Sequence, residues 1–143
     1  MEEMEEQAYI DSNVFLDSIL NRGKEGIKAT ELLEAVKKGK MKMATSTLTF
    51  DEVFWIVKKE RGYENALLGI EFFLSIPNLR FIDVSLGVLF TALEIMKENR
   101  LDPRDAIHAS CALSSGIRLI ISEDSDFDKV KGLKRKGIAD LHI

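Results

Sequence analysis

Acidic side chains stand at four separate places in this sequence where a folded sheet could bring them together: Asp11, Glu52, Asp105, and the pair Asp124 and Asp126. The first acid and the last two follow short apolar runs, and the other two fall in the first turns of expected helices. Carboxylates packed about 4 Å apart repel by about 4 kcal/mol per pair at an effective dielectric constant of about 20. No Lys or Arg is adjacent to Asp11 or Glu52, so a divalent cation is the expected compensation. Oxygen ligands favour Mg²⁺ or Mn²⁺, and one or two such ions suit phosphodiester hydrolysis.

Each acid also has a purely structural explanation. Glu52 could complete a capping box with Thr49, and Asp105 could favour the positive end of its own helix. Asp124 could cap a helix, and Asp11 could be an ordinary acid in a turn. These explanations compete with the functional one for each acid taken singly. Four segments that converge on one edge favour a metal site.

Short apolar runs alternate with stretches of helical spacing along most of the chain. Strands are predicted at 8–10, 41–46, 81–84, 118–122 and 139–143. Helices are predicted at 14–20, 29–36, 50–57, 63–74, 86–96 and 103–116, with a short helix before the last strand. Such alternation implies right-handed crossovers, so we expect a three-layer α/β/α sandwich with a central, mainly parallel sheet of four to five strands. Its functional crevice would lie at the carboxyl ends of the strands, where the acids fall.

Length and composition set the limits of this interpretation. The chain has 143 residues, of which 45% are apolar and 31% charged, as is typical of one globular domain. We expect that domain at 8–143, after an acidic, flexible extension at 1–7. The apolar runs are far shorter than the roughly 20 residues of a membrane span, and the acidic N-terminus is unlike a signal peptide, so we expect a cytoplasmic protein. One cysteine and two histidines leave little for a disulfide or a zinc site.

The net charge of −4 counts against general electrostatic binding of nucleic acid. Two local basic runs count in its favour. One run comprises Lys129, Lys131, Lys134, Arg135 and Lys136, and the other comprises Lys58, Lys59 and Arg61. Either run could follow an RNA backbone, or it could be a solvated helix face.

Two kinds of ring-bearing side chain are interpreted as structural. His108 follows Asp105 by three residues on an alanine-rich helix, and we expect a satisfied or surface histidine because the chemistry needs no imidazole. Trp55 shares helical spacing with Phe50 and Phe54, which favours core or dimer surface over a base-stacking platform.

Four motifs together resemble the PIN-domain ribonucleases, most of all the VapC-type toxins of prokaryotic toxin–antitoxin pairs. In the order of that family, the motifs are Tyr9–Leu16, Ser46–Val53, Leu101–Ala109 and Ile121–Phe127. The resemblance implies catalytic metal ligands at Asp11, Glu52, Asp105 and Asp124, with Asp126 as an auxiliary ligand. Asp51 is an alternative to Glu52, although the register of the motif favours Glu52.

Three neutral side chains in these motifs are candidate supporting residues. Ser12 would orient a carboxylate or the metal-bound water, or it would cap the next helix. Asn13 would hydrogen-bond a neighbouring acid, or it would be an ordinary turn residue. Ser122, which keeps the hydroxyl of the family's more usual threonine, is open to the same two interpretations.

The resemblance further implies Mg²⁺ or Mn²⁺ dependence, endonuclease action on single-stranded RNA, a homodimer and a small antitoxin that blocks the site. We therefore expect a metal-dependent endoribonuclease that is the toxin of such a pair. Two alternatives stay open. One is an RNA-maturation nuclease of the same family, and the other is a non-catalytic interaction domain with the PIN fold. The presence of all four acids counts against the second.

Overall fold

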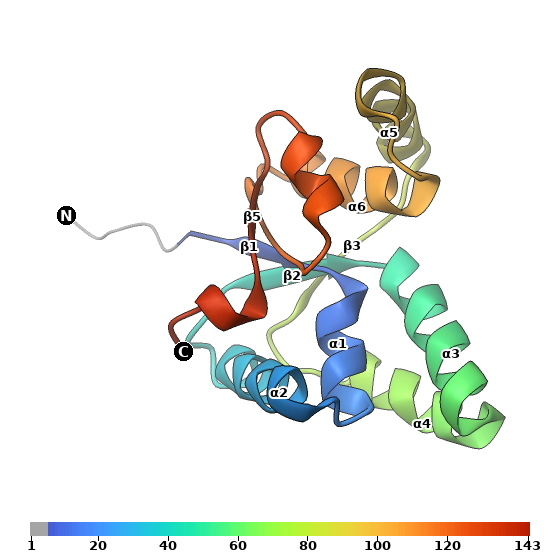
Figure 1. Ribbon diagram of the computed structural model, residues 1–143, viewed down its shortest axis with the longest axis vertical. Helices are drawn as coiled ribbons and strands as arrows, with labels where there is room; N and C mark the ends of the chain where they lie inside the picture. The colour runs from blue at the N-terminus through green and yellow to red at the C-terminus, as the bar shows by residue number, and fades with distance from the viewer. Residues whose placement is uncertain (1–5) are drawn as a thin grey trace.

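The computed structural model describes residues 6–143, so most of the expected extension at 1–7 lies outside the described residues. Strands alternate with helices along the chain (Figure 1). The strands are β1 (Ala8–Ile10), β2 (Met43–Ser46), β3 (Arg80–Ile82), β4 (Leu119–Ile121) and β5 (Lys134–Lys136). The α-helices are α1 (Ser12–Ile19), α2 (Gly23–Lys37), α3 (Leu48–Arg61), α4 (Tyr63–Leu74), α5 (Leu86–Asn99) and α6 (Pro103–Ser114). Two 3₁₀-helices are η1 (Ser125–Lys129) and η2 (Ile138–Asp140).

The five strands form one sheet in the order β3-β2-β1-β4-β5, and every neighbouring pair is parallel. β1 is at the centre, where Tyr9 pairs with Ala44 of β2 and with Ile120 of β4. A parallel order of this kind needs crossovers that place helices on the faces of the sheet. The expected α/β/α sandwich with a parallel sheet is confirmed.

Two apolar clusters fill the spaces on either side of the sheet. Helices α1–α4 lie on one side and α5 and α6 on the other (Figure 1). Successive residues of β1 point to opposite faces, so Ile10 packs with the first group of helices and Tyr9 with the second. In the first cluster Phe15 and Phe73 meet edge to face, with ring centroids 5.0 Å apart. Within residues 6–143, no helix is both long enough and apolar enough to cross a membrane.

The last strand is not where the sequence pattern predicts it. The fifth strand is Lys134–Lys136, whereas 138–140 form η2 and the chain ends without a strand at 139–143. β5 pairs only with β4, at the edge of the sheet, so its side chains need not be apolar, and edge lysines discourage pairing with other chains. Ile138 and Leu141 supply the apolar pattern at the end of the chain by packing into the core. Backbone pairing, and not side-chain burial, decides this strand.

Candidate functional site

The carboxyl ends of β1, β2 and β4 bring the predicted acids to one edge of the sheet. Asp11 is the N-cap of α1, directly after β1. Glu52 lies in α3, which begins two residues after β2. Asp105 is in the first turn of α6, which opens at Pro103, the favoured position for proline because its missing N–H is not needed there. Asp124 is the N-cap of η1, and Asp126 lies within it.

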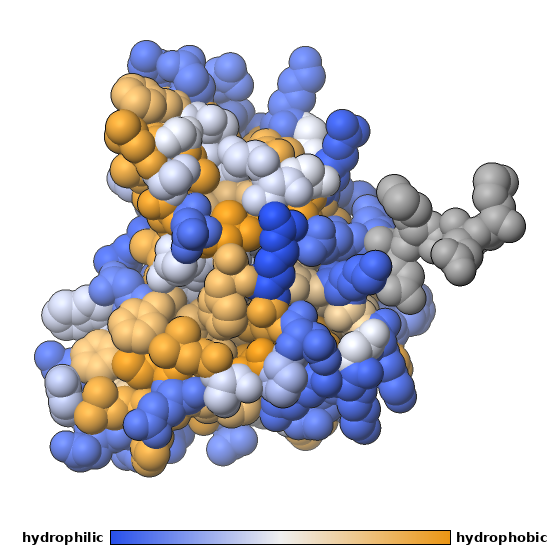
Figure 2. All heavy atoms as spheres, turned by 180° about the vertical axis from the view of Figure 1, so that it is seen from behind, coloured by the Kyte–Doolittle hydropathy of each residue, from blue (hydrophilic) through white to orange (hydrophobic). Residues whose placement is uncertain are grey.

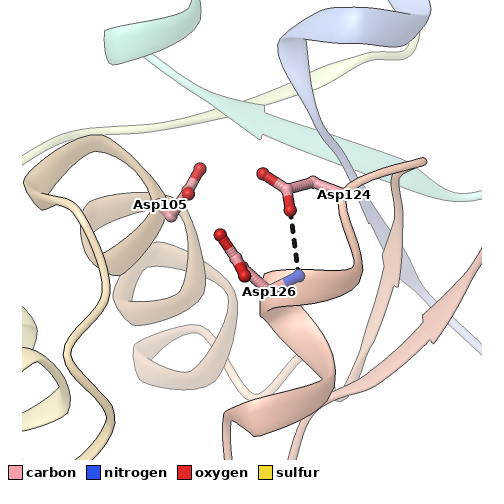
Figure 3. Close-up of side chains that lie close together, drawn as sticks. All are labelled: Asp105, Asp124 and Asp126. Carbon is pink, nitrogen blue, oxygen red and sulfur yellow. Dashed lines mark hydrogen bonds between the residues drawn. The ribbon is translucent and has the colours of Figure 1, made fainter.

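Three of the five acids form a tight group, which we call the Asp105 trio: Asp105, Asp124 and Asp126. Ligand oxygens of the three carboxylates all lie within 4.8 Å of one another. The side chain of Asp105 points from α6 towards the two others (Figure 3). Asp124 also accepts a hydrogen bond of 2.9 Å from the backbone N–H of Asp126, so its capping role and its place in the trio coexist.

Repulsion within this edge perturbs Asp105. Partial burial, followed by the negative charges of Asp124 and Asp11, raises the pKa of Asp105 from 3.8 to about 6. The carboxyl group thus binds a proton more tightly than an ordinary aspartate does, because its ionised form is poorly solvated and faces like charges. A cation placed among the trio would relieve both effects.

A backbone amide and a hydroxyl group hold Asp11, the most buried of the five acids. Its Oδ1 accepts a 2.8 Å hydrogen bond from the backbone N–H of Ser12, and its Oδ2 accepts one of 2.7 Å from Ser122 Oγ. Ser122 Oγ in turn accepts a hydrogen bond of 3.0 Å from the backbone N–H of Asp124, so one hydroxyl links two of the acids. Ser12 is the first residue of α1, and Asp11 is the cap, so the capping interpretation of Ser12 is wrong. The Ser12 hydroxyl contacts Glu52 Oε2 at 3.3 Å and Asp11 Oδ1 at 3.4 Å.

Glu52 contacts Ser12 and His108 at the sheet edge and takes no part in capping α3. The cap residue of α3 is Thr47, and Thr49 lies inside the helix with its hydroxyl 2.7 Å from that of Thr45. The capping box of Thr49 with Glu52 is therefore wrong. Glu52 is half-buried and bonded to Ser12 and His108, whereas the neighbouring Asp51 is exposed.

His108 is the main feature of the site that sequence reasoning placed outside it. The ring is fully buried on α6, its Nε2 contacts Glu52 Oε1, and the same nitrogen lies 3.7 Å from Asp11 Oδ1. Its Nδ1 lies 2.5 Å from the Tyr9 hydroxyl, which donates its proton to Ser46 Oγ at 2.8 Å. Nε2–H donates to the Glu52 carboxylate, whereas the role of Nδ1 towards the Tyr9 hydroxyl depends on the tautomer of the ring.

The surroundings of the ring raise its affinity for a proton. Burial alone would lower the pKa of His108, but the hydrogen bond to Glu52 and the charges of Asp11 and Glu52 outweigh it and raise the pKa. His108 is therefore a satisfied histidine and not a surface one. Its spacing of three residues from Asp105, one turn along the same helix face, is the signal that could have placed it at the site.

His108 changes the charge balance inferred from the sequence. Asp11 and Glu52 have no Lys or Arg beside them in the chain, but the His108 ring, when protonated, places a positive charge next to both. The Asp105 trio has one cation in the described ion pairs, the exposed Lys129, whose Nζ lies 3.2 Å from Asp126. The need for an added cation is therefore strongest at the trio.

The two basic runs are arranged differently from a simple helix face. Lys134–Lys136 form β5, where Arg135 pairs with Asp128 at 3.0 Å and donates a 3.2 Å hydrogen bond to the carbonyl of Ser122. This hydrogen bond supports the loop that carries Asp124. The helix-face interpretation is wrong for this part of the first run, whereas Lys58, Lys59 and Arg61 do lie in the last turn and a half of α3.

Trp55 and Asn13 lie beside the acids, along a hollow between α1 and α3. Both residues line it together with Ser12 and Glu52. The Trp55 side chain is 55% exposed, so it is not a core residue. Lys58 Nζ lies over its ring, 5.0 Å from the centroid.

One family model and several solved structures are similar to this chain. The family model of the PIN domain matches residues 8–133. One similar structure is VapBC2 from Rickettsia felis bound to a DNA fragment from the VapBC2 promoter. It has a TM-score of 0.73 at 20% sequence identity, and the match covers 92% of this chain and 98% of that chain. VapC20 from Mycobacterium tuberculosis, a sarcin-ricin loop cleaving toxin, has a TM-score of 0.71 at 17% identity, covering 85% and 92%. PAE2754 from Pyrobaculum aerophilum has a TM-score of 0.64 at 19% identity, covering 94% and 92%.

No curated protein matches the sequence of the chain. The family model nevertheless spans every segment that carries an acid, from β1 to η1, and ends one residue before β5. With its parallel sheet and the acids gathered at the carboxyl edge, the chain belongs to the PIN-domain family.

Proposed function

We propose that this protein is a Mg²⁺- or Mn²⁺-dependent endoribonuclease that cleaves single-stranded RNA. The observation that carries the proposal is the Asp105 trio, three carboxylates within 4.8 Å of one another at the functional edge of a PIN domain. Its donors are all carboxylate oxygens, which suit hard cations. The pKa of Asp105 is raised by burial and by the charges of Asp124 and Asp11, so a cation bound among these carboxylates would favour the ionised form.

The proposed ligands are the trio together with Asp11 and Glu52, acting directly or through water. The bound cation would activate water and neutralise the charge that develops in an in-line phosphoryl displacement. Side chains of this protein keep the acids in place. Ser122 holds the carboxylate of Asp11 and the backbone of Asp124, and His108 holds Glu52. Ser12 and Asn13 line the approach to Glu52 as supporting residues.

The proposal includes a biological setting, the toxin of a toxin–antitoxin pair that works in the cytoplasm. Two of the similar structures, from Klebsiella pneumoniae and Rickettsia felis, are described as a toxin–antitoxin complex and as VapBC2. A small antitoxin protein that covers the acids is the proposed partner.

A homodimer is the second proposed assembly. Four large apolar side chains of α5 are exposed to between 42% and 69%, namely Leu86, Leu89, Phe90 and Leu93. Apolar surface gathers over this helix at the upper left of Figure 2. An unpartnered apolar helix face of this kind suits a second copy of the chain.

Cleavage of RNA by matched variants tests the proposal. Labelled single-stranded RNA is incubated with the wild type, Asp11→Asn and Asp105→Asn in Mn²⁺, Mg²⁺ or EDTA. We expect internal cuts by the wild type only when a metal is present. Each variant should be slower by about 100-fold or more, the loss seen when a group that stabilises transition-state charge is removed. Asp51→Asn, which changes the exposed neighbour of Glu52, is the matched control and should cut at the wild-type rate.

The outcomes separate the alternatives. Wild-type cleavage by Asp11→Asn or Asp105→Asn would show that the ligand assignment is wrong. No cleavage by any protein, together with no heat of Mn²⁺ binding in isothermal titration, would favour a non-catalytic interaction domain.

A further inference from the structure

We propose that the hollow between α1 and α3 binds the nucleotide next to the cleaved phosphate, with its base stacked on Trp55. The inference rests on the proposed ribonuclease function and adds a binding subsite to it. The hollow has a volume of about 270 Å³, close to the lower end of ligand pockets at roughly 300 Å³.

Continuity with the acids places the hollow next to the reacting phosphate. Ser12 and Glu52 line the hollow and also belong to the hydrogen-bonded group around Asp11. Glu52, Trp55 and Lys59 follow one another at spacings of three and four residues on α3, so they share one helix face. An RNA strand whose phosphate sits at the acids therefore runs directly past Trp55.

The hollow is lined by three cations, Arg22, Lys59 and Arg104, and by two carboxylates, Glu52 and Glu60. Lys59 extends from α3, and Arg104 stands next to Asp105 at the start of α6. The third cation, Arg22, is already engaged by Glu60 at 3.0 Å and Asp17 at 3.5 Å. The ion pairs of the described residues do not use Lys59 or Arg104, which leaves both for a phosphate of the strand.

The exposed ring of Trp55 is suited to stacking with a base, a contact that binding of a phosphate alone would not require. Trp55 is 55% exposed beside a half-buried acid, and the Lys58 ammonium lies over one face of its ring, 5.0 Å from the centroid, so a base would stack on the opposite face. An exposed indole with cations around it is the arrangement on which single-stranded nucleic acids stack their bases. Stacking tolerates every base, so this subsite contributes affinity more than sequence preference.

Intrinsic fluorescence gives a direct test because Trp55 is the one tryptophan of the chain. The full protein in EDTA is titrated with single-stranded hexaadenylate, and with an abasic ribose-phosphate hexamer as the matched ligand without bases. We expect hexaadenylate to quench the emission and the abasic hexamer to leave it unchanged. Equal quenching by both hexamers would overturn base stacking.

Kinetics of variants give the second readout. For RNA cleavage with Mn²⁺, Trp55→Ala should raise KM by about tenfold with little change in kcat, and Trp55→Phe should recover most of the loss. Lys59→Ala should also raise KM, whereas Lys40→Ala, a change at an exposed lysine before β2, should not. Circular dichroism and thermal unfolding confirm that each variant is folded.

Failure of the subsite and failure of the enzyme look different. Metal-dependent cleavage with a wild-type KM in Trp55→Ala, and no quenching in the wild type, would overturn the subsite and leave the ribonuclease intact. Absence of cleavage in the wild type would overturn the ribonuclease, and the subsite with it.

Discussion

Replacing Asp105 with asparagine should stabilise the protein when no metal is present. Partial burial and the charges of Asp124 and Asp11 raise the pKa of Asp105 from 3.8 to about 6. A difference of about 2 units between the folded and unfolded states corresponds to about 3 kcal/mol, and solvent screening at this half-buried carboxyl reduces the expected gain to about 1–2 kcal/mol. Asparagine keeps the shape of the side chain and removes the charge that causes this cost.

The sign of the pH dependence follows from the raised pKa. Between pH 3.8 and about 6 the folded protein binds more protons than the unfolded chain, so the wild type loses stability as the pH rises through this window. Above this window the ionised Asp105 destabilises the folded protein in full, and below it the protonated Asp105 does not. The advantage of Asp105→Asn should therefore be largest at about pH 7.5 and should shrink as the pH falls towards about 4.

Denaturant unfolding in EDTA at these two pH values measures the effect, and thermal unfolding should show a gain of about 3–8 °C at the higher one. Asp83→Asn, at an exposed carboxyl in the loop after β3, is the control and should change the free energy of unfolding by less than about 0.5 kcal/mol. Added Mn²⁺ should make the wild type more stable than Asp105→Asn, because a ligand stabilises the protein that binds it more tightly. An Asn variant that is no more stable than the wild type at about pH 7.5, or a gain that does not change with pH, would refute this account of Asp105.

Two further predictions concern other parts of the molecule. His108→Ala should lower the free energy of unfolding by about 2–4 kcal/mol, since it leaves a cavity and removes the partner of Glu52 and of the Tyr9 hydroxyl; a loss below about 1 kcal/mol in urea unfolding would contradict the buried network. Phe90→Glu, at a side chain 63% exposed on α5, should convert the proposed dimer to a monomer in sedimentation velocity while leaving the melting temperature of the monomer nearly unchanged; an unaltered dimer would show that α5 is not its interface.

Local pattern was enough to predict the architecture and the edge where the acids meet. Apolar runs such as Leu119–Ile121, buried on both faces of a parallel sheet, are continuous and easy to recognise. Parallel connections send every strand in the same direction, so a residue that follows a strand arrives at the same edge as residues that follow the others. Asp11 and Asp124 could therefore be placed together although they are far apart in the chain.

Features that depend on distant partners could not be predicted in this way. β5 contains Lys134, Arg135 and Lys136, and it is a strand because β4 offers an open edge to its backbone. His108 takes its role from Tyr9 and Glu52, which are 99 and 56 residues away in sequence. The spacing of His108 from Asp105 points to the site, but nothing local in the sequence indicates Tyr9 or Glu52 as its partners.

The sequence by itself determined which side chains could ligate a cation and which layered fold would carry them, because periodicity and strand direction are local properties with few solutions. Only the tertiary structure decided how the negative charge is shared. It places the buried His108 ring against Asp11 and Glu52, and it leaves the carboxylates of the Asp105 trio close together with an exposed lysine as their ion-pair partner. Packing fixes these distances, and electrostatic energy depends on distance and burial far more than on order along the chain.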